Sequence, residues 1–295
     1  MSIVDKIRNI FVAKKNIKNT LIEHGSDINN DTVLADYPDK IDELRCSTNV
    51  MNDIELEFAK FYFDNYFRNK AFWRSTLKTI DLSNMYLFSN KDEQDMFYEY
   101  DLSHYFYQSE AETIILPANQ RFCGTMMSTF EGCSNLKTIE NIETLDPRWI
   151  KSLKWCFKDC TSLEYLDLSS WDFRYDVNRV WLYDVQEMFA NCTNLKYLDV
   201  SKFELTYALH IPEYAEISQL KDMFTNCRSL EVLKLEQCAA ETFEYIVECL
   251  YLNGTPDNPY LGPCKIYYDP NNYYNYHVPE ALREIYPFYE FLPIS

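Results

Sequence analysis

The residues of this chain with the greatest chemical potential are its cysteines and histidines, which could bind zinc or act as nucleophile and base. The sequence contains ten cysteines and four histidines. Structural zinc sites favour pairs of cysteines with two residues between them, whereas the closest pair here, Cys156 and Cys160, has three residues between them. No histidine belongs to a His-Glu-x-x-His motif. We therefore expect no bound metal and mostly reduced, buried thiols, because free cysteine commonly serves as a small core residue.

Motifs for other kinds of catalysis are missing as well. The five glycines stand far apart in the sequence, whereas phosphate-binding loops need clustered glycines where the backbone approaches a ligand. No Gly-x-Ser-x-Gly nucleophile elbow is present. Carboxylates are numerous, so a pair arranged for glycoside hydrolysis stays open as an alternative. We expect a protein that is not an enzyme, with no catalytic residues and no cofactor.

The charge and hydropathy of the chain bear on its partners. Its 295 residues carry a formal net charge of −18, which opposes nucleic acid and anionic membranes as partners because phosphate binding needs clustered Lys and Arg. Only residues 6–18 hold a local excess of basic side chains. No stretch approaches the roughly 18 apolar residues of a membrane span, and the N-terminus does not resemble a secretory signal. We expect synthesis in a cytoplasm without membrane insertion.

A repeated motif organises the middle of the chain. The pattern Phe-x-x-Cys-x-x-Leu occurs four times without gaps, and its cysteines are 27, 32 and 35 residues apart (133 to 160, 160 to 192, 192 to 227). Units of this length that repeat along a chain are typical of stacked repeat architectures. The predicted structural core of the repeats consists of Phe130, Cys133, Leu136, Phe157, Cys160, Leu163, Phe189, Cys192, Leu195, Phe224, Cys227 and Leu230.

The second half of each unit alternates apolar and polar residues. Residues 166–171 and 198–203 share this pattern with residues 80–85, far upstream. Such alternation predicts half-buried strands. Degenerate earlier repeats are expected around residues 77–80 and 114–116. The three-residue spacing of Phe, Cys and Leu favours a helical or 3₁₀ turn that faces inward and sets the four cysteines in a buried column.

These repeats resemble the BspA-type leucine-rich repeats of bacterial surface proteins, phages and mobile elements. The resemblance covers about residues 72–290, with long inserts at residues 174–183 and 205–217 as departures. It implies an α+β leucine-rich-repeat solenoid, in which parallel strands are stacked with short helical turns. It also implies an N-terminal helical segment and a C-terminal cap of strand and helix. Proteins of this family generally bind partners rather than catalyse reactions.

The chain divides into four expected regions: residues 1–50, 51–120, 121–240 and 241–295. The first has helical periodicity from Val4 to Leu21, ended by Gly25, and a second short helix from Asp36. It resembles a segment near the start of phage tail and fibre proteins, which implies attachment to a particle. A helical hairpin that caps the repeats is the alternative of equal weight.

The regions on either side of the regular repeats are rich in aromatic residues. Residues 53–73 predict a buried helix that packs on the first degenerate repeat. Residues 121–240 contain the regular repeats, and the last region closes them, with a strand over residues 264–270 and a short helix over residues 279–286. The tyrosines and asparagines of this last region would also suit stacking against a glycan.

The function that these features favour is binding by a virion component of a phage, of fibre or decoration type. The N-terminal segment would contact other virion proteins, and a homo-oligomer is possible. The alternatives are a cytoplasmic or cell-surface scaffold for a protein partner and, with less support, an adhesin for a host-surface protein or glycan. Residues between the core leucines should face outward, so we predict a binding strip made of Tyr165, Asp167, Tyr197 and Asp199.

Overall fold

The computed structural model of the protein describes residues 72–83, 102–119, 121–173, 182–205, 222–252, 262–272 and 278–294. The helices expected in residues 4–24 and 36–44, and nearly all of the aromatic segment 53–73, lie outside these ranges, as does most of both inserts. Of the aromatic segment, Phe72 and Trp73 are described, and they belong to a turn rather than to a helix.

Short parallel strands dominate the described residues. They are β1 (Thr79–Asp81), β2 (Thr113–Ile115), β3 (Arg121–Thr125), β4 (Thr138–Glu140), β5 (Asp146–Ser152), β6 (Tyr165–Asp167), β7 (Tyr197–Asp199), β8 (Val232–Lys234), β9 (Lys265–Tyr268) and β10 (Glu290–Pro293). A 3₁₀ turn, η2 (Ile142–Thr144), and two helices, α5 (Ala240–Leu252) and α6 (Val278–Ile285), complete the set. The described chain is therefore of the α+β class with parallel strands, and this part of the predicted fold is confirmed.

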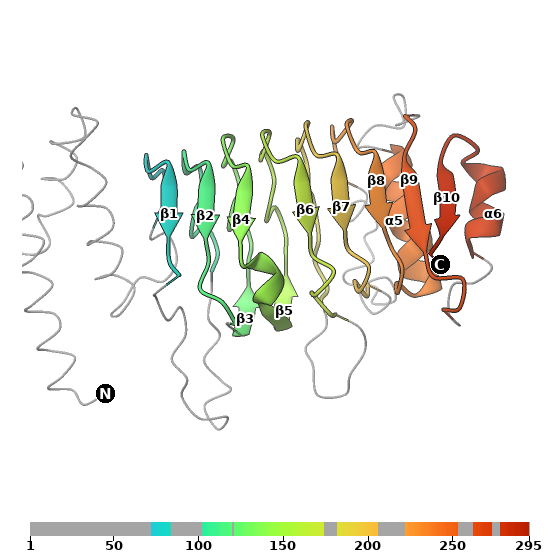
Figure 1. Cartoon of the computed structure of the whole chain (residues 1–295), viewed down its shortest axis with the longest axis horizontal. Helices are drawn as coiled ribbons and strands as arrows, with labels where there is room; N and C mark the ends of the chain where they lie inside the picture. Colours follow the sequence, from blue (N-terminus) through green and yellow to red (C-terminus); the bar gives the residue numbers. More distant parts are fainter. Residues whose placement is uncertain are drawn as a thin grey trace, which may run out of the picture.

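Three hydrogen-bonded sheets arrange these strands. One has the order β1-β2-β4, a second has the order β10-β9-β8-β7-β6, and the third is the pair β3-β5. Figure 1 shows the strands of the first two sheets side by side in sequence order, with α5 and α6 at the C-terminal end. The strands of the first sheet pair without a shift, so that the middle residues Ile80, Ile114 and Ile139 are direct neighbours, whereas the β3–β5 pair contains two register shifts.

The strands are shorter than the sequence pattern suggested. β6 ends at Asp167, because the Asp167 carboxylate accepts a hydrogen bond from the backbone N–H of Ser169 at 2.9 Å and turns the chain. This is an Asx-type turn, in which a side chain competes with the strand ladder for a backbone donor. Aspartates at the ends of β1 and β7 accept the equivalent bonds from Ser83 and Ser201. The prediction of strands reaching residues 171 and 203 is therefore wrong at their C-terminal ends.

The Phe-x-x-Cys segments form consecutive turns, which corrects the prediction of a helical or 3₁₀ element. Around Phe130, the hydrogen bonds Thr129 to Met126, Glu131 to Ser128 and Cys133 to Phe130 each close a four-residue turn. The residues two before and two after the phenylalanine, Ser128 and Gly132, have left-handed φ angles of 57° and 75°. A helix is excluded because such φ angles reverse its sense.

These turns point alternate backbone N–H groups along the stack rather than back into their own unit. The amides of Ser128, Phe130 and Gly132 donate to carbonyls of the next unit, at Lys154, Cys156 and Lys158, with distances of 2.8 to 2.9 Å. Equivalent bonds link the units that contain Phe72, Phe106, Phe157 and Phe189 to the unit that follows each. We call this side of the molecule the turn side, and the side formed by β1, β2, β4 and β6–β10 the strand side.

A column of stacked phenylalanines runs through the core on the turn side. Its neighbouring rings have centroids 5.2 to 5.7 Å apart and nearly parallel planes; the members in order are Phe72, Phe106, Phe130, Phe157, Phe189 and Phe224. All twelve repeat residues expected in the core are buried. The early repeats expected around residues 77–80 and 114–116 contain β1 and β2, but Phe72 and Phe106 were not predicted as members of this column. In both of these units the segment between the phenylalanine and the strand is one residue shorter than in the regular repeats. The pattern Phe-x-x-Cys-x-x-Leu therefore does not match these units.

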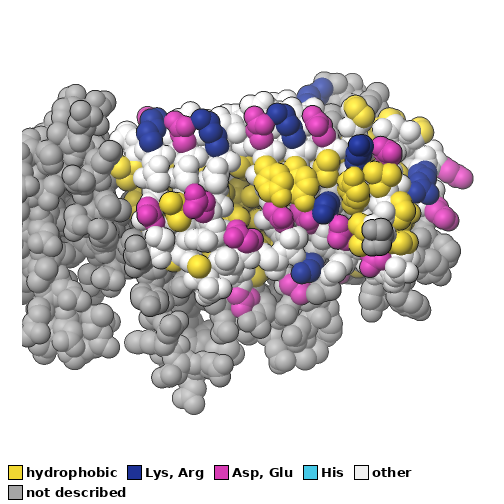
Figure 2. Space-filling view, in the orientation of Figure 1, with side chains coloured by type: hydrophobic (Ala, Val, Ile, Leu, Met, Phe, Trp, Pro, Cys, Tyr) yellow, Lys and Arg dark blue, Asp and Glu magenta, His cyan; other side chains and the backbone are white. Residues whose placement is uncertain are grey.

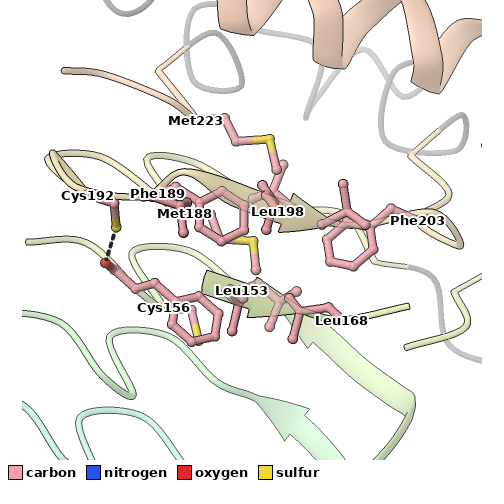
Figure 3. Close-up of a cluster of buried hydrophobic side chains, with 14 of the residues drawn as sticks. Leu153, Cys156, Leu168, Met188, Phe189, Cys192, Leu198, Phe203 and Met223 are labelled. Carbon is pink, nitrogen blue, oxygen red and sulfur yellow. Dashed lines mark hydrogen bonds between the residues drawn. The ribbon is translucent and has the colours of Figure 1, made fainter. Parts of the chain in front are cut away.

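The repeat cysteines act as buried hydrogen-bond donors between units. The thiols of Cys133, Cys160 and Cys192 lie 2.9, 3.1 and 3.0 Å from the carbonyl oxygens of Phe106, Phe130 and Phe157. Figure 3 shows the Cys192 bond beside the packed leucine, methionine and phenylalanine side chains of successive units. In the two short units the same position holds a serine, Ser75 or Ser109.

The strand side is interrupted once, between β4 and β6. The two strands are edges of different sheets, although Phe130 and Phe157 of the same two units remain stacked at 5.3 Å on the turn side. The fully buried Trp171, four residues after β6, donates its indole N–H to the carbonyl of Ile142, two residues after β4, at 2.9 Å. We call this interruption the sheet break.

Candidate binding surface

The predicted strip lies on the second sheet, and the structure brings its two tyrosines into contact. The rings of Tyr165 and Tyr197 stack with centroids 4.3 Å apart and planes 11° apart. Tyr165 is 57% exposed, one of few large apolar side chains with this exposure among the described residues. Burial, followed by the nearby carboxylate of Asp199 and by Tyr165, raises the pKa of Tyr197, so its phenol stays protonated at neutral pH.

The acidic half of the strip is occupied mainly by local structural bonds. Asp199 is only 3% exposed, so the prediction that it faces solvent is wrong. One of its oxygens accepts hydrogen bonds from the backbone N–H and the hydroxyl of Ser201, at 3.0 and 2.6 Å. The other accepts from the Tyr197 hydroxyl at 3.4 Å and faces the Lys234 ammonium at 3.7 Å.

Asp167 keeps more of its carboxylate available than Asp199 does. One oxygen forms the turn with Ser169, and the other has the Tyr165 hydroxyl at 3.5 Å, the limit of hydrogen-bond distance. Asp167 is partly exposed. Of the four predicted surface residues, Tyr165 and Asp167 are therefore accessible, Tyr197 is half-buried, and Asp199 supports the others from beneath.

A row of charged residues lies beside the strip, at the position just before each strand. Its sign alternates along the stack, and the members in order are Lys78, Glu112, Lys137, Glu164, Lys196 and Glu231. Figure 2 shows this row along one edge of the molecule, with apolar side chains gathered below its second half. Lys137 and Glu112, and Lys196 and Glu164, form ion pairs at 2.7 Å. Because the row neutralises itself, we assign it to stacking rather than to a ligand.

Other strands carry outward positions in register with the predicted strip or with each other. Thr113 and Ile115 of β2 stand in register between β1 and β4, and Tyr267 of β9 is the register partner of Lys234. The two sheets do not form one continuous surface, because β4 and β6 are not paired. The sequence carries one sign of the sheet break, which is Asn141 directly after β4. The equivalent residue after β1, β2, β6, β7 and β8 is apolar.

The described residues contain no group that is arranged like a metal centre. No group of three or more His, Cys, Asp or Glu side chains in these ranges is placed to hold a metal ion. Within the same ranges, eight cysteines are buried free thiols. No helix of the described chain combines the length and apolar character that a bilayer span requires.

Comparisons with known proteins add no relative. No family model matches the chain, and no curated protein or solved structure matches it.

Proposed function

We propose that this protein is a non-enzymatic leucine-rich-repeat solenoid of the BspA type that binds a protein partner through the strand side of its second sheet. The exposed, stacked Tyr165–Tyr197 pair is the observation that carries the proposal. The other repeated features have partners within the stack: the phenylalanines pack on each other, the thiols bond to carbonyls, and the charged row pairs with itself. Aromatic side chains beside polar groups are typical of residues that dominate protein interfaces.

The setting we propose is a phage particle, in which the chain is a fibre or decoration protein. The support is the resemblance of residues 1–45 to N-terminal segments of phage tail and fibre proteins. Purified particles from the producing host, analysed by mass spectrometry, should contain this chain in a fixed ratio to the major capsid protein. A chain found in the lysate and not in the particles would favour the scaffold alternative.

A photo-reactive residue tests the binding surface directly. Benzoylphenylalanine at Val232, which neighbours Tyr197 in register, leaves the tyrosine pair intact. The matched control carries it at Thr79, in the same outward column of the first sheet. We expect irradiation in producing cells to give one discrete adduct from position 232 and none from position 79. Replacing Tyr165 and Tyr197 by alanine should abolish that adduct; equal adducts from both positions would refute the surface.

A further inference from the structure

At the sheet break the facing edges of β4 and β6 are not hydrogen-bonded to each other. Between β6 and β7, the Tyr197 N–H donates to the Glu164 carbonyl at 3.2 Å, and between β2 and β4 the Thr138 N–H donates to the Glu112 carbonyl at 3.2 Å. Across the break the described residues form no equivalent bond from Tyr165 to Lys137. In a parallel ladder alternate residues face opposite neighbours, so Ile139 of β4 and Tyr165 and Asp167 of β6 direct their backbone groups into the break. Unpaired strand edges are templates for further hydrogen bonding.

Tyr165 presents one face of its ring toward the same place. Tyr197 covers the other face at 4.3 Å, and the residue of the first sheet at the same column position is Thr138, which is small and exposed. The 57% exposure of Tyr165 agrees with an uncovered ring face. The face of an aromatic ring carries negative potential and attracts a cation.

Carboxylates lie on both sides of the break, and the nearby lysines already have partners. Glu140 of β4 is exposed, and its carboxylate has no partner among the described residues. Asp167 of β6 has one oxygen free of short bonds. Lys137 is paired with Glu112, while Lys234 lies between Asp199 and Glu236. Among the described residues, neither Glu140 nor Asp167 forms an ion pair with a lysine or an arginine, although Lys234 interacts with Asp167 at longer range.

We propose that the sheet break binds an arginine side chain presented by an extended segment of a basic protein partner, an inference that rests on the proposed binding function. The guanidinium stacks on the open face of Tyr165, and its N–H groups donate to the carboxylates of Glu140 and Asp167. The partner's segment lies over the outer surface of the break. Arginine fits better than lysine because its planar group combines ring stacking with several fixed donors, whereas an ammonium is compact and strongly hydrated.

A capped pentapeptide, Thr-Val-Arg-Val-Thr, provides the probe, titrated into the isotope-labelled full chain and followed by nuclear magnetic resonance. We expect the amide signals of Ile139, Tyr165 and Asp167 to shift together. Lysine in place of arginine should weaken binding about fivefold, and neutral citrulline about tenfold or more. Shifts of equal size with the citrulline peptide would overturn the proposal, since they would show a site that ignores the charge.

Matched variants locate the site. Glu140→Gln should weaken binding about fivefold, while Glu143→Gln, the same charge change three residues away and off the strand, should alter it less than twofold. Tyr165→Leu keeps an apolar side chain without a π face and should weaken binding about tenfold. Equal effects of the two glutamate variants would show long-range attraction only and would refute the specific site.

Two further outcomes separate this inference from the function on which it rests. If the peptide does not bind but the adduct at position 232 forms and depends on the tyrosine pair, the arginine site is wrong and the proposed function stands. If sedimentation shows that the chain associates with itself and that Tyr165→Leu abolishes this association, a second copy occupies the break, and the basic-partner proposal is overturned.

Discussion

The two main sheets share one interior and differ on their outer surface. Ile80, Ile114 and Ile139 fill the inward position of the first sheet, and Leu166, Leu198 and Leu233 fill it in the second. The first residue of each strand faces outward. It is Thr79, Thr113 or Thr138 in the first sheet and Tyr165, Tyr197 or Val232 in the second. Stacking constrains the inward positions because each side chain must fit the units on both sides. The outward positions are free of that constraint, so they can carry a function in one sheet and not in the other.

The sheets also differ in how they are joined. On the turn side the phenylalanine column and its hydrogen bonds continue from Phe130 to Phe157 without a change of spacing. On the strand side the ladder stops at β4 and resumes at β6. The turn side therefore holds the stack together, and the strand side is where its surface varies.

Removing the joining column should have the largest effect on stability. Phe157→Ala deletes a fully buried ring stacked between Phe130 and Phe189. We expect the free energy of unfolding to fall by about 3–5 kcal/mol, the range for Phe→Ala in a packed core, measured by urea denaturation. The matched control Tyr165→Ala, on the strand side of the same unit, should change it by less than about 1 kcal/mol. Similar losses for both variants would mean that the turn side does not hold the sheets together.

The thiols should make stability fall in alkaline solution. Burial raises the pKa of the Cys133 and Cys227 thiols to about 12, above the value of about 8.5 in an unfolded chain. The unfolded state therefore loses protons first as pH rises, so this stabilisation is complete below about pH 8.5 and is lost progressively toward pH 12. At pH 10 each such thiol should reduce the free energy of unfolding by about 2 kcal/mol relative to pH 8.

Serine substitution sharpens the comparison, because the two short units already carry Ser75 and Ser109 at this position. In a Cys133→Ser variant, the free energy of unfolding should fall less between pH 8 and pH 10, by the amount that one thiol contributes. The serine hydroxyl should still donate a hydrogen bond to the Phe106 carbonyl. Cys133→Ala removes the donor and should be the less stable of the two at pH 7 by about 1 kcal/mol. Unfolding curves at pH 7 and pH 10 measure both effects, and an alkaline decrease unchanged in the serine variant would disprove the thiol explanation.

Gly132 offers a smaller test of the turn geometry. Its φ is 75°, and an added Cβ would lie 2.8 Å from Cγ of Gln108 in the preceding unit. We expect Gly132→Ala to lower the free energy of unfolding by about 1–2 kcal/mol, from left-handed strain and from displacement of Gln108. Asn191 occupies the equivalent position with a φ of 61° and bonds to Asp159 at 2.6 Å. Asn191→Ala should give a loss of similar size; thermal unfolding that is unchanged in both variants would argue against the left-handed turns.

The charged row should contribute least. Lys137→Ala breaks an exposed ion pair with Glu112, and such pairs add little stability because water and salt screen them. We expect the smallest loss of stability among these variants at low salt, and no loss in 1 M NaCl. Lys196→Ala, in the second sheet, is the matched variant and should behave alike. A clearly larger loss in either sheet would show that the row does more than align the units.

The sequence by itself determined the interior of this protein. The spacing of Phe130, Cys133 and Leu136, repeated three more times, identified buried positions because each repeat must present the same side chains to its neighbours. Alternation located the strands, and proline with apolar periodicity located the C-terminal strand and helix, observed as β9 and α6. These features depend on contacts that recur at a fixed interval, which a sequence displays directly.

The tertiary structure alone decided the features that depend on which groups meet. It replaced the expected helical turns by left-handed turns, because their N–H groups bond to the next unit rather than within one unit. It buried Asp199 through bonds to Ser201 and Lys234. It also produced the sheet break between β4 and β6, although the units of these strands stay stacked on their other side. A periodic sequence does not encode such a local departure, because the pairing of two strands depends on how their particular units fit together.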